Sequence, residues 1–294
     1  MDVQPTGITC PLVTPFDPRS NTIDEDALED LTDHVLESDI DGLFPCGTAG
    51  EFASLTPEER RLVSEIVVER TSSDTTVLVG AAATTISETV SYATHADKIG
   101  ADAVVVTMPY FHTATDPEGN RQFFEAVADR SPLPVLLYNI PIYTGSVIEL
   151  DTLVTIASHE NIIGIKDSGG DFEYLSSILR RLPDDFVVLQ GYDTLLTPAL
   201  RIGADGGVNA GSNVVPETYA TLYETAETDR GKEFQEAIFP FFNACTEYGF
   251  APTVKTALEY LDVLPNATVR PPLRPPSEKG RERIKTSIDS LREH

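Results

Sequence analysis

A lysine that closes an otherwise apolar segment is the residue of this sequence best suited to act as a nucleophile. Lys166 ends the run IIGIK (162–166) and is followed by DSGG. At the end of a buried strand its amine would be partly desolvated, and desolvation favours the neutral amine that attacks carbonyl carbons. A single lysine in such a place more often extends its amine to solvent, so the neighbouring motifs decide its role.

Two further features would complete a site for a carbonyl compound. Tyr138 lies near the end of PVLLYNI (134–140), and its phenol can shuttle protons during bond cleavage. The stretch GTAG (47–50) can form a turn whose backbone N–H groups hold a carboxylate, while the Thr48 hydroxyl relays a proton to Tyr138. Each signal is weak alone, since such a tyrosine is commonly a core residue. Together they describe a site where an amine attacks the carbonyl of a 2-oxo acid.

The elements that must position these residues follow a regular β–α alternation. Short apolar runs rich in Val and Ile predict parallel strands covered by helices. Eight such repeats favour a closed (β/α)8 TIM barrel, of the α/β class, whose reactive residues lie at the C-terminal ends of the strands. An open doubly wound sheet would need a GxGxxG turn after its first strand, and the sequence has none. The expected strands are 8–14, 42–46, 76–81, 102–108, 134–140, 162–166, 186–191 and 206–211.

Strand signals stop after residue 215, and helical patterns follow at about 217–228, 231–248, 252–263 and 277–292. We expect the barrel to span residues 1–215 and the C-terminal helices to span 216–294. No long flexible linker separates the two parts, so they should form a single structural unit. Earlier in the chain, TPEE (56–59) predicts a capped helix start. The buried face of that helix would be Leu62, Val63, Ile66 and Val67.

The charge balance is strongly acidic. The chain has 47 Asp and Glu against 21 Lys and Arg, for a net charge of −26. Such a surface repels nucleic acid and anionic membranes, so we expect neither as a partner. The acidic residues are spread over helix faces, which predicts a halophilic protein kept soluble in concentrated salt. The three cysteines lack CxxC pairing and metal-ligand spacing, and no secretory signal or long apolar span is visible. We therefore expect a cytoplasmic protein.

Several motifs carry a family resemblance. In order and spacing, GTAGEF, PYF, YNIP-x-x-TG, GIKDSGGD and GYD followed by GADGG resemble the dihydrodipicolinate synthase/N-acetylneuraminate lyase superfamily. The resemblance covers about residues 7–265. It implies a TIM barrel with C-terminal helices, usually a homotetramer, and a pyruvate Schiff base on the lysine. It also implies that the enzyme needs no metal and no organic cofactor.

The resemblance also implies roles for individual residues. Lys166 would form the Schiff base, and Tyr138 would be the general acid/base. Thr48 and Ala49 would bind the pyruvyl carboxylate, largely through backbone N–H groups. The residues that would line the pocket for the second substrate are Ser168, Gly191, Asp193 and Val208.

Departures from the family pattern bear on the second substrate. Dihydrodipicolinate synthases normally carry a second threonine, a second tyrosine and an arginine where this chain has Ala49, Phe111 and Tyr143. Phenylalanine cannot relay a proton, so lysine biosynthesis is disfavoured. Sialate lyases typically place a glutamate where this chain has Thr194. The turn with GEF and the GIKDS segment are most similar to those of 2-keto-3-deoxy-gluconate-type aldolases.

The sequence therefore predicts a class I aldolase that cleaves a 2-keto-3-deoxy sugar acid to pyruvate and an aldehyde. Dihydrodipicolinate synthase, N-acetylneuraminate lyase and sugar-acid dehydratase remain alternatives on the same lysine. An alternative of another class is a non-catalytic barrel that binds a small ligand and regulates. For His112, which follows Phe111, a contact to substrate hydroxyls and a solvated loop position both stay open.

Overall fold

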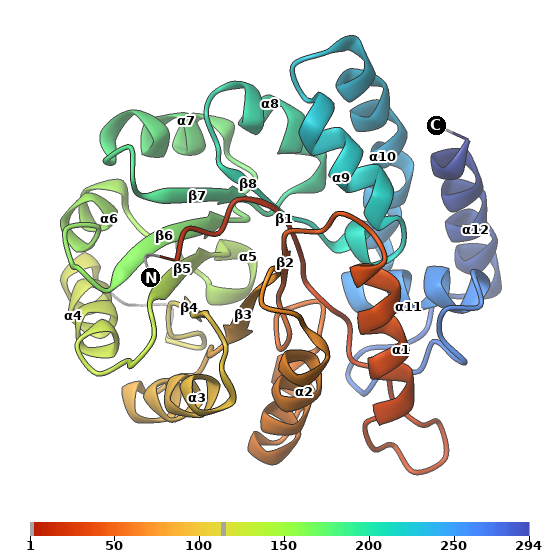
Figure 1. Cartoon of the computed structure of the whole chain (residues 1–294), viewed down its shortest axis with the longest axis horizontal. Helices are drawn as coiled ribbons and strands as arrows, with labels where there is room; N and C mark the ends of the chain where they lie inside the picture. The colour runs from red at the N-terminus through yellow and green to blue at the C-terminus, as the bar shows by residue number, and fades with distance from the viewer. Residues whose placement is uncertain (1–2, 113–115, 294) are drawn as a thin grey trace.

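The protein is a closed barrel of eight parallel strands, which confirms the predicted TIM-barrel fold (Figure 1). The computed structural model describes residues 3–112 and 116–293. The strands pair in sequence order, and β8 closes the barrel on β1. Their bounds are β1 (Gly7–Cys10), β2 (Gly42–Leu43), β3 (Thr76–Gly80), β4 (Ala103–Thr107), β5 (Val135–Asn139), β6 (Ile162–Asp167), β7 (Val187–Gln190) and β8 (Gly206–Val208).

Helices surround the barrel. The ring consists of α1 (Glu25–Leu36), α2 (Pro57–Arg70), α3 (Ile86–Ile99), α4 (Pro117–Ala128), α5 (Pro141–Thr144), α6 (Leu150–Ile156), α7 (Phe172–Arg181), α8 (Leu196–Arg201) and α9 (Pro216–Thr225). Because α9 follows β8 and contacts β1, the ring extends past residue 215, where we expected the C-terminal helices to begin. In the described residues no helix is long and apolar enough to cross a membrane.

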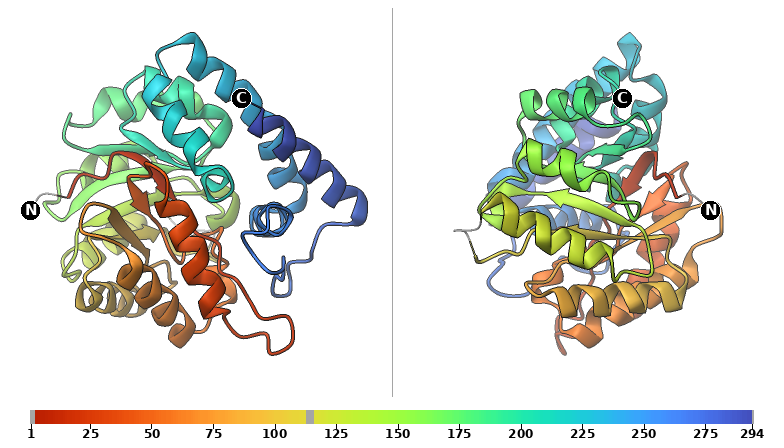
Figure 2. Two further views of the ribbon diagram at one scale, coloured as in Figure 1. Left: turned by 45° about the vertical axis from the view of Figure 1, so that its right-hand side comes forward. Right: turned by 90° about the vertical axis from the view of Figure 1, so that its left-hand side faces the viewer.

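Three further helices follow the ring. They are α10 (Asp229–Tyr248), α11 (Phe250–Tyr260) and α12 (Glu278–Arg292), and they contact one another. Figures 1 and 2 show them gathered at one side of the barrel, with α10 beside α9. The C-terminal helices therefore pack against a limited sector of the ring.

The first and last strands are shorter than the sequence predicts. We expected strands over 8–14 and 206–211, but β1 ends at Cys10 and β8 ends at Val208. Pro11 has no N–H to continue a ladder. Instead, the Asn213 side chain accepts from Val13 N at 3.1 Å and donates to Pro11 O at 2.9 Å. A side chain thus takes the place of backbone pairing at this closure of the barrel.

The start of α2 follows the predicted capping box. The Thr56 hydroxyl accepts from Glu59 N at 3.2 Å, and the Glu59 carboxylate accepts from Thr56 N at 2.9 Å. The two bonds satisfy backbone donors that the helix itself cannot pair. Of the expected face, Val63, Ile66 and Val67 are buried, whereas Leu62 is half-buried.

Alternation along the strands separates the barrel interior from the layer under the helices. In β5, Leu136 and Tyr138 belong to the interior cluster, whereas Leu137 packs in the outer layer. β6 pairs with β5 so that Tyr138 lies opposite Lys166. The same alternation therefore brings the lysine and the tyrosine to one end of the interior.

A buried ion pair joins α11 to the turn after β2. Lys255 and Glu51 pair with both side chains fully buried. The amine also donates to Thr268 O at 2.8 Å, and the backbone N–H of Arg270 donates to the second Glu51 oxygen at 3.2 Å. Burial lowers the pKa of Lys255 to about 8. The pair thus fastens the turn to the C-terminal helices.

We expect Lys255→Met to lower the free energy of unfolding by about 3–5 kcal/mol, because it leaves the Glu51 carboxylate buried without its counter-charge. Denaturant-induced unfolding followed by circular dichroism measures the change. Lys232→Met is the matched control, since Lys232 forms an exposed pair with Glu236 at 3.7 Å and should unfold like the wild-type protein. Equal effects of the two substitutions would contradict the structural role of the buried pair.

Candidate active site

The Lys166 amine and the Tyr138 ring lie in contact at the C-terminal ends of neighbouring strands. Their positions are opposite each other in the β5–β6 ladder. Lys166 Nζ lies 3.9 Å from the centroid of the Tyr138 ring and 5.2 Å from that of Phe44. Both Lys166 and Tyr138 are 4% exposed. In the described part of the chain no carboxylate pairs with this amine, so aromatic faces and an adjoining cavity surround it.

The cavity next to Lys166 has a volume of about 220 Å³. It brings together most of the residues that the sequence predicts for the site, and the Thr48 hydroxyl lies 3.4 Å from the Tyr138 hydroxyl. The predicted residues among its lining are Thr48, Ala49, Tyr138, Tyr143, Lys166, Ser168, Gly191 and Val208. The Ser168 hydroxyl is buried without a hydrogen-bond partner in the described residues, which leaves it available to a ligand.

The turn after β2 presents unpaired backbone donors to this cavity. Within the described residues, the N–H groups of Thr48 and Ala49 donate to no protein acceptor. The turn is bounded by two residues in the left-handed region, Cys46 with φ 57° and Glu51 with φ 55°. A non-glycine residue holds such a conformation only where its surroundings fix it, and the Lys255 pair does so for Glu51. The turn can therefore hold a carboxylate.

Two predicted residues lie outside the cavity. Asp193 is buried, and its carboxylate accepts from the Tyr219 hydroxyl at 2.6 Å and from Gly211 N at 3.2 Å. Burial raises the pKa of this carboxyl. We expected Asp193 to line the pocket as Gly191 does. However, β7 ends at Gln190 and Asp193 begins a 3-10 turn, so strand alternation no longer applies.

Phe111 is the second predicted residue that lies outside the cavity. Its side chain is 88% exposed and its φ is 82°. His112 is also exposed and packs edge-on against Phe111, with ring centroids 5.9 Å apart. The structure therefore places both residues on the surface.

The cavity contains residues that sequence reasoning missed. Tyr192 lies next to the predicted Gly191, and its ring packs on Phe242 of α10 at 4.8 Å between centroids. Other missed residues come from the end of α10 and the start of α11, where no strand-end rule applies. The missed lining residues are Pro11, Ile140, Ile142, Tyr192, Ala210, Cys245, Thr246, Gly249 and Phe250. The sequence could have signalled Ile140, Ile142 and Tyr192 through their places within YNIP-x-x-TG and GYD. Pro11 and Ala210 lie within expected strands.

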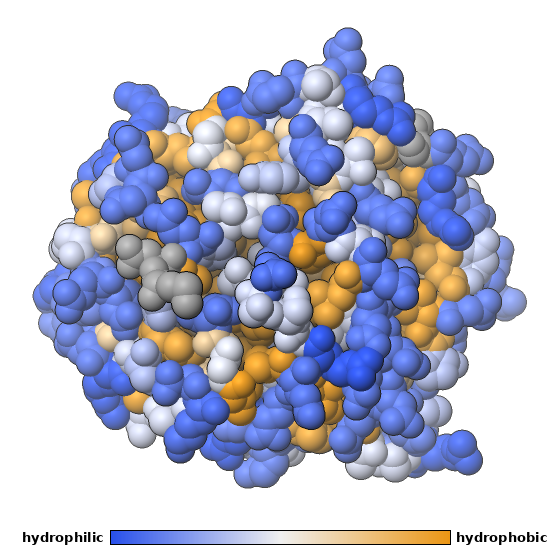
Figure 3. All heavy atoms as spheres, viewed as in Figure 1, coloured by the Kyte–Doolittle hydropathy of each residue, from blue (hydrophilic) through white to orange (hydrophobic). Residues whose placement is uncertain are grey.

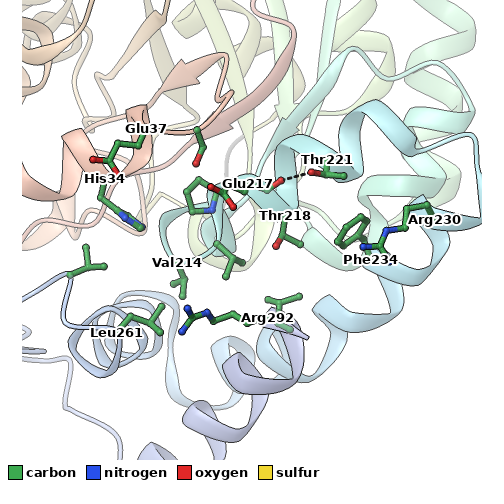
Figure 4. A pocket seen from close by; sticks show the side chains of 15 residues that line it. His34, Glu37, Val214, Glu217, Thr218, Thr221, Arg230, Phe234, Leu261 and Arg292 are labelled. Carbon is green, nitrogen blue, oxygen red and sulfur yellow. Dashed lines mark hydrogen bonds between the residues drawn. The ribbon is translucent and has the colours of Figure 1, made fainter. Parts of the chain in front are cut away.

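A larger groove of about 750 Å³ lies away from this chemistry, among α1, α9, α10 and α12. Figure 4 shows His34 and Glu37 at one edge, Glu217 above and Arg292 across the groove. None of the predicted site residues lines it. Among the described residues no group of three or more His, Cys, Asp or Glu side chains could hold a metal ion. The small cavity around Lys166 is therefore the candidate active site.

Gly191 leaves room for the lysine side chain. A Cβ on this residue would lie 2.0 Å from Ser168 Oγ and 2.9 Å from Lys166 Cε. We expect Gly191→Ala to weaken the affinity for pyruvate at least tenfold, because a displacement of about 1 Å at a reacting group is costly. Isothermal titration calorimetry measures the affinity. Gly119→Ala is the control, since its Cβ would meet nothing closer than 3.6 Å. Unchanged affinity in Gly191→Ala would contradict this geometry.

Comparison with known proteins shows the family of the chain. The model of the dihydrodipicolinate synthetase family matches residues 4–291. A 4-hydroxy-tetrahydrodipicolinate synthase of Methanopyrus kandleri is 31% identical over 99% of this chain and 98% of its own. An uncharacterized DapA-like lyase of Halobacterium salinarum is 33% identical over 97% of this chain and 93% of its own.

Solved structures of dihydrodipicolinate synthases share the fold of this chain. The 4-hydroxy-tetrahydrodipicolinate synthase of Methylacidiphilum fumariolicum superposes with a TM-score of 0.93 at 31% identity, covering 99% of this chain and 97% of that one. Dihydrodipicolinate synthase of Aquifex aeolicus also superposes with a TM-score of 0.93, at 29% identity over 98% of each chain. With its barrel, its lysine and its matched length, the chain belongs to the dihydrodipicolinate synthetase family.

Proposed function

We propose that the protein is a pyruvate-forming class I aldolase that cleaves a 2-keto-3-deoxy sugar acid. The observation that carries this proposal is the composition of the cavity. Lys166 is the one charged side chain among its described lining residues. It lies over the Tyr138 ring, and Tyr138 lies within 3.4 Å of the Thr48 hydroxyl. The cavity thus offers one amine, one proton-transfer pair and free backbone donors. These groups suit a substrate with a single carboxylate, whose cleavage gives pyruvate and an uncharged aldehyde.

In the proposed reaction, the carboxylate of the substrate binds to the N–H groups of Thr48 and Ala49. The Lys166 amine adds to the C2 carbonyl, the Tyr138 phenol donates a proton to the departing hydroxyl, and loss of water leaves a protonated imine and a phenolate. The phenolate takes the proton of the C4 hydroxyl while the C3–C4 bond breaks, and the bonding pair moves into the imine to form an enamine. The aldehyde leaves and Tyr138 returns its proton to C3. Water then adds to the imine and gives its spare proton to Tyr138, which releases pyruvate and the free amine.

The names of the relatives favour a second candidate, 4-hydroxy-tetrahydrodipicolinate synthase. That reaction joins pyruvate to an aldehyde that carries its own carboxylate. Apart from Lys166, no described lining residue of the cavity carries a positive charge. Position 143 holds a tyrosine where the resemblance implies an arginine. A second carboxylate would therefore be buried without a counter-charge, which is unfavourable. N-acetylneuraminate lyase and sugar-acid dehydratase stay alternatives on the same lysine.

A non-catalytic binding barrel is the alternative of another class. The unpaired Lys166 amine, which lies over the Tyr138 ring, would suit a carboxylate in either case. Simple binding does not require a proton-transfer pair beside the amine. The Tyr138 and Thr48 hydroxyls, 3.4 Å apart, supply such a pair, and this favours catalysis over simple binding.

The choice of aldehyde separates the two enzyme candidates. With pyruvate and glyceraldehyde we expect formation of a 2-keto-3-deoxy acid, measured by chromatography of the product. With aspartate semialdehyde we expect a kcat/KM at least tenfold lower, because its carboxylate finds no cation. Tyr143→Arg should narrow that difference, since it adds the missing charge. Condensation with the semialdehyde alone would contradict the proposed substrate class.

We also infer that the protein works as a cytoplasmic homotetramer. Three exposed hydrophobic side chains support an association, namely Phe111, Ile142 and Tyr143. Ile142 and Tyr143 both line the cavity. Exposed apolar groups of this size are typical of contact surfaces. A sedimentation measurement that shows only monomers would contradict this assembly.

We infer in addition that the protein is adapted to concentrated salt. The net charge is −26, and hydrophilic side chains cover most of the face in Figure 3. Self-repulsion of such a surface is screened by salt. The midpoint of thermal unfolding should therefore rise steadily between 0.1 and 2 M KCl. A midpoint that stays constant or falls over this range would contradict the adaptation.

A further inference from the structure

Directly behind the lysine and the tyrosine lies a second, fully buried pair. Asn139 follows Tyr138 in β5, Asp167 follows Lys166 in β6, and the two pairs are consecutive steps of the same ladder. Asn139 and Asp167 are both 0% exposed. Strand alternation sends them to the side of the sheet opposite the cavity. They therefore cannot touch the substrate, yet each adjoins a residue that would.

The side chains of this pair form a connected network. Asn139 Nδ2 donates to Asp167 Oδ1 at 2.7 Å, and Asn139 Oδ1 accepts from Ile148 N at 3.1 Å. Asp167 Oδ1 also accepts from Gly169 N at 3.2 Å. The Tyr174 hydroxyl of α7 donates to Ile148 O at 2.5 Å. The network thus ties the ends of β5 and β6 to the loop after α5 and to a helix of the ring.

Backbone bonds continue the same connection across three strands. Ser168 N donates to Asn139 O at 2.8 Å, and Gly191 N donates to Asp167 O at 2.7 Å. Ser168 and Gly191 both line the cavity. The pair therefore adjoins five lining residues through covalent or hydrogen bonds, since Ile140 follows Asn139 and also lines the cavity.

Burial of the Asp167 carboxylate is unfavourable for folding. Its Oδ2 atom is buried and has no hydrogen-bond partner in the described residues. Burial raises the pKa of Asp167 to about 6, against the opposing effect of the Asn139 bond. The charge of Asp171 raises this pKa further, and the Asp167 carboxylate in turn raises the pKa of Tyr174. In the described residues Asp167 forms no ion pair. A neutral pair would be less costly for folding, so the charged one calls for a functional explanation.

We propose that Asn139 and Asp167 are positioning residues that hold Tyr138 and Lys166 at reacting distance. A charge-assisted hydrogen bond is shorter and stronger than a neutral one, so it fixes the spacing of β5 and β6 tightly at the step next to the reacting groups. The two residues act through the backbone and do not touch the substrate. This inference rests on the Schiff-base function proposed above, and it does not depend on which aldehyde is used.

Exchange of the pyruvate methyl protons in D2O, followed by NMR, tests the proposal without a second substrate. Exchange requires both imine formation and proton transfer. Asn139→Asp places two carboxylates at hydrogen-bond distance, which raises the pKa of one of them. The exchange rate is therefore followed from pH 7 to pH 10 and compared with that of the wild-type protein at high pH, where both carboxylates are ionised and repel each other. We expect the maximal exchange rate to fall at least tenfold, because the amine and the phenol no longer lie at reacting distance.

The exchanged pair Asn139→Asp/Asp167→Asn should recover the rate to within about threefold of wild type, because one carboxylate again faces one amide. Asp102→Asn is the matched control. The Asp102 carboxylate accepts from Val77 N at 2.8 Å at the N-terminal end of β3, so the exchange rate should not change. Thermal unfolding of each variant reports whether it is folded.

Two results would overturn the inference. One is a wild-type exchange rate in Asn139→Asp, and the other is a folded double variant that stays as slow as the single one. If Asn139→Asp does not fold, the exchange rate of the double variant alone tests the proposal, and a folded double variant that stays slow would overturn it. No exchange by the wild-type protein would instead overturn the Schiff-base function, and with it this inference.

Discussion

The parallel pairing of β5 with β6 is the constraint on which the rest of the site depends. One register sets Tyr138 opposite Lys166, and alternation sends both side chains into the barrel. A shift of β6 by one residue against β5 would turn Lys166 under the helices and bring Asp167 inward. Barrel closure and the buried outer layer make such a shift unfavourable. The chemistry of the amine therefore depends on the register of a sheet.

Two buried pairs of polar side chains outside the cavity hold the site residues in place from different sides. The Lys255–Glu51 pair fixes the turn that presents Thr48 and ties it to α11. The Asn139–Asp167 pair fixes the strand ends on the other side of the amine. Both pairs carry charge where apolar side chains would be less costly for folding. The structure thus places a buried charged pair on each side of the site.

The sequence was sufficient to predict the barrel and the residues at the strand ends. Lys166, Tyr138 and Thr48 could be placed together because the C-terminal ends of parallel strands converge. The same rule was wrong for Asp193, since the strand stops at Gln190 and the chain turns. The strand-end rule also could not predict that Cys245 and Phe250 line the cavity, because their positions depend on how the last helices pack.

We propose that Lys166 is the residue that bonds covalently to pyruvate. Borohydride reduction of the protein with pyruvate, followed by mass spectrometry of its peptides, tests this most directly. We predict a reduced pyruvyl adduct on Lys166 and none on Lys255, which is equally buried but paired with Glu51. Absence of any adduct, or an adduct on a different lysine, would contradict the account.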